Sequence, residues 1–249
     1  MAPRPPCYGR AVNVGDATLE HVAGLRDRMA ARDDKGSVRS SAQGFARDLA
    51  DTFSGVVLAR LFLVLPFSQL PEGDRTFARG IVGGDARLQA TTNVLSLVGT
   101  YGRDPTWCDR AGSRGHLAIP LIDRAFVSNI PMVAKLLADL EVDLAGLDDG
   151  KPIATRRMLG GRNAAFYVPD AQDAVDAQGR SIIPARDFVK QHGVRTVFGM
   201  GGAYVDGSLA VTIVFTDEVI PRLVVDRFAS LISSFKMATS ANLALKKIY

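Results

Sequence analysis

The stretch GVRTVFGMGGAYVDGSLAVTIVFT, residues Gly193 to Thr216, decides the fold that the rest of the chain must fit. At its centre, Asp206-Gly207 is a dipeptide that a two-residue type I′ hairpin turn prefers, because both central positions need positive φ. Apolar residues dominate on either side of this pair, as expected of two strands. The stretch therefore predicts an antiparallel β-hairpin in the last quarter of the chain.

The hairpin register follows from that turn, since side chains alternate between the two faces of a strand. The pairs predicted on one apolar face are Tyr204–Leu209, Gly202–Val211, Met200–Ile213 and Phe198–Phe215. On the other face, Val197, Gly199, Gly201 and Ala203 are predicted opposite Thr216, Val214, Thr212 and Ala210. This second face is small and shallow, so either a helix or a ligand is expected to approach the sheet closely there.

A long C-terminal helix is predicted over residues 221–247. Pro221 suits a first helical turn, and neither Pro nor Gly follows it as far as Lys247. Apolar residues recur along the run at spacings of three and four. At 1.5 Å per residue the helix would be roughly 40 Å long, which exceeds what a small sheet needs. Its end is therefore expected to pack on a partner helix or to lead to another domain.

Length and composition indicate an ordinary globular protein. The chain has 249 residues, of which 47% are hydrophobic and 22% charged, typical of one large or two small soluble domains. The longest apolar run, Gly55 to Leu65, is interrupted by Arg60 and is too short to span a bilayer. The opening residues MAPRPPCYGR lack the apolar region of a signal peptide. We expect a cytoplasmic protein with no membrane association.

Charge and cysteine content argue against two further classes. The net charge is +4, but the basic residues are scattered and are not interleaved with aromatics, so a nucleic-acid partner is not expected. The cysteines, Cys7 and Cys108, are expected to be free thiols. No two histidines have the spacing of metal ligands, so no metal site is predicted.

The order of elements predicts an α+β fold. Besides the hairpin, strands are expected at 56–65, 93–101, 116–122 and 164–169, with helices between them. The final strand pair is antiparallel, so we expect one antiparallel sheet flanked by helices. Residues 1–40 are expected to form an N-terminal tail and helix, and residues 41–249 one domain that ends in the helix over 221–247.

The segment Trp107 to His116, WCDRAGSRGH, gathers unusual chemistry ahead of a strand. Trp107 can stack on a planar ligand, Arg110 or Arg114 can hold a carboxylate or phosphate, and Asp109 can orient either arginine. The alternative is a loop fastened by an Asp–Arg pair and anchored by Trp107. His116 has no companion for a metal site, and a structural role is the expectation for it.

The second half of the chain resembles a GAF domain. The resemblance lies in a strand ending in Tyr167-Val168-Pro169-Asp170, a polar excursion, a short helix, and the run VRTVFGMGGAYVDGSLAVTIVFTDEVIPRL. It implies a GAF/PAS-like sheet and a cytoplasmic sensory domain of bacterial signalling proteins, without catalytic residues. It also implies a homodimer through the terminal helices, which acts with a downstream kinase or cyclase.

The resemblance further implies a small-molecule ligand, of unidentified chemistry, between the sheet and its covering helices. The residues expected around it are Trp107, Asp109, Arg114, His116, Tyr167 and Asp170.

Two alternatives on the same fold stay open. One is a small redox enzyme that uses Cys108, because some stand-alone GAF proteins reduce free methionine sulfoxide. That chemistry needs a reactive thiolate and a resolving cysteine, and Cys7, in a Pro-rich tail, is poorly placed to be one. The other is a dimerisation module without a ligand. No nucleophile-elbow motif is present, and we expect a sensor rather than an enzyme.

Overall fold

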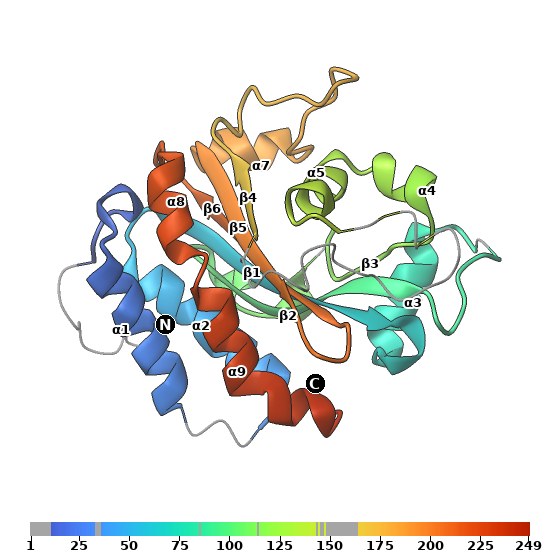
Figure 1. The fold of residues 1–249 in the computed structure, drawn as a ribbon. Helices are drawn as coiled ribbons and strands as arrows, with labels where there is room; N and C mark the ends of the chain where they lie inside the picture. The colour runs from blue at the N-terminus through green and yellow to red at the C-terminus, as the bar shows by residue number, and fades with distance from the viewer. Residues whose placement is uncertain are drawn as a thin grey trace.

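A single antiparallel sheet of six strands organises the computed structural model, which describes residues 11–32, 36–84, 86–113, 115–142, 144, 147 and 164–249. The strand order is β3-β2-β1-β6-β5-β4 (Figure 1). The strands are β1 (Val56–Pro66), β2 (Asn93–Gly102), β3 (Ala118–Pro120), β4 (Ala164–Val168), β5 (Thr196–Ala203) and β6 (Leu209–Thr216). The predicted fold class, an antiparallel sheet flanked by helices, is confirmed.

β1 lies at the centre because both of its faces are apolar. It pairs with β2 on one side and with β6 on the other. All its side chains are buried except those of Arg60 and Pro66, which are partly exposed. A strand covered on both faces reads as a continuous apolar run, which explains why the sequence predicted it well.

Four helices cover one face of the sheet, called here the bundle face (Figure 1). They are α1 (Leu19–Ala31), α2 (Val38–Thr52), α8 (Arg222–Phe228) and α9 (Leu231–Ala244). Aromatic pairs join them across the core: Phe45 of α2 stacks on Phe235 of α9 at 6.0 Å between ring centroids. Phe53, which ends α2, meets Phe228 of α8 edge-on at 5.3 Å. The boundary predicted between residues 40 and 41 falls inside α2.

The opposite face, called here the α4–α5 face, has a separate core. Its covering helices are α4 (Arg124–Ser128), α5 (Pro131–Asp139) and α7 (Arg186–Gln191), while α3 (Glu72–Ile81) packs by β3. Pro131 occupies the first turn of α5 and so begins a new helix after α4. Among the described residues, no helix is long and apolar enough to cross a membrane.

The hairpin is present, but its predicted register is wrong by one residue. Gly201 pairs with Val211, not with Thr212, and Ala203 pairs with Leu209. The loop has three residues, because the N–H of Tyr204 donates to the carbonyl of Ser208 across it. Gly207 takes the left-handed conformation, with φ at 86°, as a bulged three-residue hairpin requires. The one-residue shift exchanges the face that each partner occupies.

The shift also changes what the glycines face. Gly199 and Gly201 lie opposite Ile213 and Val211, which belong to the core of the α4–α5 face. The predicted register placed Val214 and Thr212 opposite these glycines and so made this face small and shallow. In the structure the larger Ile213 and the apolar Val211 lie there instead.

The C-terminal run forms two helices rather than one. α8 ends at Phe228 and α9 begins at Leu231, with Ala229 and Ser230 between them. Beyond α9 the chain folds back, since Lys246 takes a positive φ of 56°. The carbonyls of Lys247 and Ile248 then accept hydrogen bonds from the first two N–H groups of α2, those of Val38 and Arg39.

Candidate functional site

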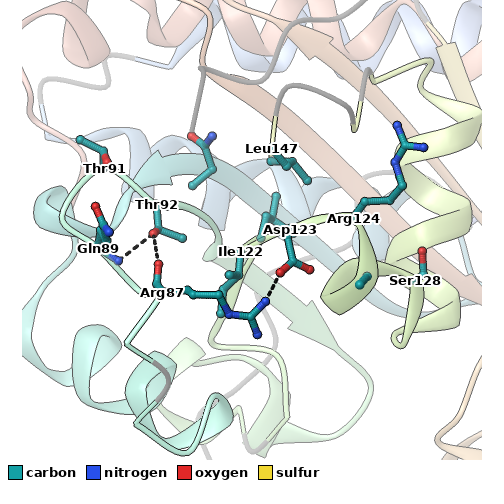
Figure 2. Close-up of a pocket in the computed structure, with 12 residues that line it drawn as sticks. Arg87, Gln89, Thr91, Thr92, Ile122, Asp123, Arg124, Ser128 and Leu147 are labelled. Carbon is teal, nitrogen blue, oxygen red and sulfur yellow. Dashed lines mark hydrogen bonds and ion pairs between the residues drawn. The ribbon is translucent and has the colours of Figure 1, made fainter. Parts of the chain in front are cut away.

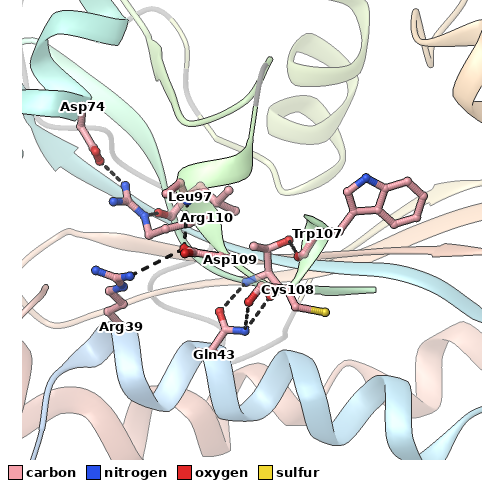
Figure 3. A network of polar contacts seen from close by, with 10 residues as sticks. Arg39, Gln43, Asp74, Leu97, Trp107, Cys108, Asp109 and Arg110 are labelled. Atoms are coloured by element: carbon pink, nitrogen blue, oxygen red, sulfur yellow. Dashed lines mark hydrogen bonds and ion pairs between the residues drawn. The ribbon is translucent and has the colours of Figure 1, made fainter. Parts of the chain in front are cut away.

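The segment 103–113 closes an open edge of the sheet. β3 pairs with Val94, Leu95 and Ser96 of β2, and among the described residues no strand pairs with the later part of β2 on that side. Gln43 of α2 takes the partner's place: its Oε1 accepts from the Thr100 N–H at 3.2 Å, and its Nε2 donates to the Thr100 carbonyl at 2.7 Å. Nε2 also donates to the carbonyl of Cys108 at 3.0 Å (Figure 3). One amide thus fastens the segment to both α2 and β2.

Arg110 holds the segment to the bundle face through a buried ion pair with Asp74 of α3 (Figure 3). Its Nε donates to the carbonyl of Leu97 at 2.6 Å. Ser96 donates to the same Asp74 carboxylate at 3.2 Å and shares a hydrogen bond of 2.8 Å with the hydroxyl of Tyr249. The Arg110 guanidinium also lies 5.3 Å from the centre of the Tyr249 ring. Arg110 is therefore committed to a structural network and is not available to a ligand.

Trp107 lies on the other side of the segment and belongs to the α4–α5 face. It comes from the short 3₁₀ helix η3 (Pro105–Trp107), and Figure 3 shows its indole directed away from Gln43 and Arg110. The ring meets Phe188 and His192 edge-on, at 5.4 and 4.7 Å between centroids. Phe188 in turn meets Phe215 of β6 at 5.5 Å. Trp107 is thus one wall of an aromatic cluster between the sheet and α7.

His116 lies on the same face and pairs with Arg60 of β1. Its Nδ1 is 3.2 Å from Arg60 Nη1. Burial lowers the pKa of Arg60 to about 10. Burial, followed by the positive charge of Arg60, lowers the pKa of His116 to about 4. At neutral pH the pair therefore carries one positive charge, on the arginine.

A cavity of about 750 Å³ opens at the far end of this face (Figure 2). Its lining residues come from the loop before β2 and the first residue of that strand, from the segment between β3 and α4, and from α4 itself, together with Leu147. They are Arg87, Gln89, Thr91, Thr92, Asn93, Leu121, Ile122, Asp123, Arg124, Ala125, Ser128 and Leu147. Arg87 forms an ion pair with Asp123, and Asp123 also accepts from the N–H of Phe126 at 2.7 Å as the cap of α4. The cavity thus combines an apolar floor with cationic, amide and hydroxyl groups.

The predicted site residues fall into separate places. Trp107 and His116 share the α4–α5 face. Tyr167 packs on the bundle face, where its hydroxyl donates to the carbonyl of Ile220 at 2.7 Å. Asp109 is exposed beside α2, 3.9 Å from Arg39. Arg114 lies outside the described residues.

Asp170 serves a local turn after β4. Its Oδ1 accepts from the N–H of Gln172 at 3.0 Å, and its carbonyl accepts from Ala174. The same stretch runs beside the segment that leads into β5, since the N–H of Ala171 donates to the carbonyl of Arg195. The structure thus gives Asp170 a turn-forming role through its hydrogen bonds to Gln172 and Ala174.

Sequence reasoning missed three contributors to this face. Phe188 and His192 of the α7 region complete the aromatic cluster around Trp107. Arg60 was noted only as an interruption of an apolar run. A single arginine inside such a strand was the available signal, because a charge is expensive to bury without a purpose or a partner.

No protein-family model matches this chain, and no curated protein matches it. Among solved structures, it is similar to the GAF domain of an Acinetobacter phosphoenolpyruvate-protein phosphotransferase, with 11% identity, 91% of this chain and 95% of that chain covered, and a TM-score of 0.47. The phycocyanobilin-bound GAF domain of a cyanobacterial phytochrome gives 7% identity, 92% and 98% coverage, and a TM-score of 0.47. The free methionine-R-sulfoxide reductase of Neisseria meningitidis, solved with its substrate, gives 11% identity, 96% and 98% coverage, and a TM-score of 0.47.

Proposed function

We propose that this chain is a GAF-like sensory domain that binds a small molecule on the α4–α5 face and relays binding to its terminal helices. The cavity between Asn93 and Arg124 carries the proposal. Its volume of about 750 Å³ lies within the range of roughly 300–1,000 Å³ that is usual for small-molecule sites. Its mixture of apolar and polar walls suits a ligand with an apolar body and a few hydrogen-bonding groups.

The relay is supported by a short physical connection from the cavity to the C-terminus. Asn93 lines the cavity and begins β2, and Ser96 follows three positions later in the same strand. Ser96 bonds to the hydroxyl of Tyr249 at 2.8 Å and to Asp74 of α3 at 3.2 Å. A ligand that shifts the start of β2 would therefore alter the docking of the last residues, which is the differential contact that a two-state relay needs.

Dimerisation through the terminal helices belongs to the same proposal. Leu19 of α1, Leu223 of α8 and Met237 of α9 are large apolar side chains that stay exposed. Each of these three helices thus presents an exposed apolar side chain that a partner helix could cover. A second copy, and a downstream kinase or cyclase in the cytoplasm, are the partners that fit a sensory role.

The redox alternative is less well supported by the surroundings of Cys108. Its thiol is free and lies 3.5 Å from the carbonyl of Gly102 and 3.7 Å from that of Asp104. Both contacts engage the thiol as a hydrogen-bond donor to the backbone, and the described residues include no second cysteine that could resolve a disulfide. We expect Cys108→Ser to leave ligand binding unchanged, and a methionine sulfoxide reductase activity abolished by this substitution would favour the enzyme instead.

The experiment combines native mass spectrometry of freshly purified protein with thermal-shift screening against nucleotides and metabolites. A binder identified in this way is then tested on Ala125→Trp, which fills the cavity from an exposed position. The matched control is Ala177→Trp, at an exposed position outside the cavity. We expect the first variant to lose the shift and the control to keep it.

The relay is read out by hydrogen exchange of residues 245–249 with and without the binder. Increased exchange there supports the relay. A protein that retains no ligand and responds to no compound, or a binder unaffected by Ala125→Trp, would contradict the proposal.

A further inference from the structure

Arg60 is a charged side chain at the centre of the sheet. Its cross-strand partners are Ile213 of β6 and Thr100 of β2. Along β1, Leu58 and Phe62 precede and follow it on the same face, and both are buried in the apolar core there. Cations in such surroundings are normally matched by a carboxylate, because the desolvation cost is otherwise uncompensated.

No such match exists among the residues that the structure describes. Within them, Arg60 forms no ion pair, and its one hydrogen bond goes to His116 at 3.2 Å. Its Nε is buried without an acceptor. By contrast, Arg110, which is buried, is fully engaged by Asp74 and the Leu97 carbonyl.

The pairing with His116 adds a donor rather than a counter-charge. A guanidinium cannot accept a hydrogen bond, so His116 Nδ1 must be the acceptor and Nε2 must carry the ring proton. The imidazole is neutral at pH 7, because burial and Arg60 lower its pKa to about 4. The two side chains together carry one positive charge; Arg60 Nε has no acceptor in the described part of the chain, and His116 has a ring N–H at Nε2 besides the Nδ1 that faces Arg60.

We propose that Arg60 and His116 form an anion-binding site that takes a carboxylate or phosphate group of a small molecule. Guanidinium and imidazole N–H donors are the groups that recognise such oxygens. The site is separate from the cavity at Asn93: that residue pairs with Pro66, six positions along β1 from Arg60, or about 20 Å at the rise of a strand. Both side chains are partly exposed; because Arg60 Nε itself is buried, we place the anion at the exposed part of the pair.

The test follows the three histidine rings by NMR through a pH titration. Inorganic phosphate and trifluoroacetate, which both stay anionic across the His116 titration, are compared with sodium chloride at equal ionic strength. A bound anion offsets the charge of Arg60, so either anion is expected to raise the midpoint of the His116 titration by about one pH unit. The ring signals of His21, which lies in α1 on the bundle face, serve as the internal control for effects of the salts that do not involve Arg60.

Three variants separate the outcomes. Arg60→Met is expected to abolish the anion effect and to raise Tm in sodium chloride, because it replaces a partly buried cation that has no counter-charge among the described residues with an apolar side chain of similar length. Arg60→Lys keeps the charge and is expected to retain a weaker response. Arg222→Met removes an exposed arginine that pairs with Asp226 at 2.9 Å and is expected to leave His116 unchanged.

Several results would overturn the site. A His116 midpoint that is the same in all three salts shows that no anion binds. An equal response in Arg60→Met shows that any anion binds elsewhere. A large loss of Tm in Arg60→Met shows that a carboxylate of the protein already neutralises Arg60. Because the probes are simple anions, this site and the cavity proposed to bind the sensory ligand can each fail without the other.

Discussion

The side chain of Leu140, at the end of α5, lies directly on Gly201 of β5. A Cβ atom built on Gly201 would fall 2.5 Å from Leu140 Cδ1 and 2.8 Å from Cδ2. Leu140 is buried in the core of the α4–α5 face. The end of α5 therefore packs directly on Gly201. Of the two expectations that the sequence left open for this face, a helix and not a ligand approaches the sheet at Gly201.

We expect this pair to be energetically coupled. Gly201→Ala forces the end of the Leu140 side chain to move and should cost about 1–3 kcal/mol. Leu140→Ala alone should cost about 2–5 kcal/mol by leaving a cavity. In the double variant the new methyl group occupies part of that cavity, so the combined loss should be smaller than the sum of the single losses. Urea denaturation of the four proteins measures this, and strictly additive losses would contradict the contact.

A second glycine meets backbone instead of a flexible side chain. A Cβ on Gly99 of β2 would lie 2.5 Å from the carbonyl carbon and 2.6 Å from the carbonyl oxygen of Ala42 in α2. Helix backbone cannot yield as a leucine can, and Gly99→Ala would also displace Gln43 from Thr100. We expect a loss of about 3 kcal/mol or more of unfolding free energy.

The control for Gly99 is Gly73→Ala in α3, where an added Cβ meets nothing within 4 Å. Alanine is favoured over glycine in a helix by up to about 1 kcal/mol, so this variant should be neutral or slightly stabilised. Equal effects of the two substitutions in chemical denaturation would show that α2 does not sit on β2 as described.

The Arg110–Asp74 pair should be costly to break from one side. Arg110→Met leaves the Asp74 carboxylate buried with Ser96 as its remaining neighbour, and a loss of about 3–5 kcal/mol is expected. Asp74→Asn combined with Arg110→Met removes both charges and should recover part of that loss. Thermal unfolding at neutral pH measures both, and a double variant less stable than Arg110→Met would refute the pairing.

His116 should make the protein less stable in mild acid. Its pKa is about 4 in the folded chain and about 6.5 when unfolded. Above pH 6.5 the ring is neutral in both states and contributes nothing. As pH falls from about 6.5 to about 4, only the unfolded chain takes up the proton, so stability falls, by at most about 3 kcal/mol for a shift of this size.

His116→Asn removes the titrating group and should flatten this part of the pH profile. Urea denaturation at pH 7 and at pH 5 gives the difference for both proteins. A wild-type protein that loses no more stability than the variant between these pH values would show that His116 titrates normally.

Strand positions were predictable because their signal is local. The apolar run from Val56 ends at Pro66, and both ends of β1 follow from it. The hairpin register was not predictable, since Asp206-Gly207 suits a two-residue turn as well as a three-residue loop in which only Gly207 needs positive φ. The break between α8 and α9 has no Pro or Gly to announce it. It arises from packing, as Phe228 lies against Phe198 of the sheet whereas Phe235 stacks on Phe45 of α2.

The candidate site was predictable only in part. Strand alternation predicts that the side chain of Tyr167 points to the opposite face of the sheet from those of Phe166 and Val168. It does not predict which of the two faces carries Trp107. That depends on how segment 103–113 crosses the sheet edge, which Gln43 and Arg110 fix from distant positions. Phe188 and His192 come from a short helix far along the chain, and no local pattern links them to Trp107.

The way the last residues fold back has a practical consequence for how the protein is handled. The carbonyls of Lys247 and Ile248 complete the first turn of α2, and the Tyr249 ring lies between Ser96 and Arg110. Anything attached after Tyr249, whether an affinity tag or a dye, begins beside the segment that carries Trp107 and not at the tip of α9. A dye placed there would lie at the edge of the sheet. A bulky group attached after Tyr249 would disturb the hydrogen bonds from the N–H groups of Val38 and Arg39 to the carbonyls of Lys247 and Ile248.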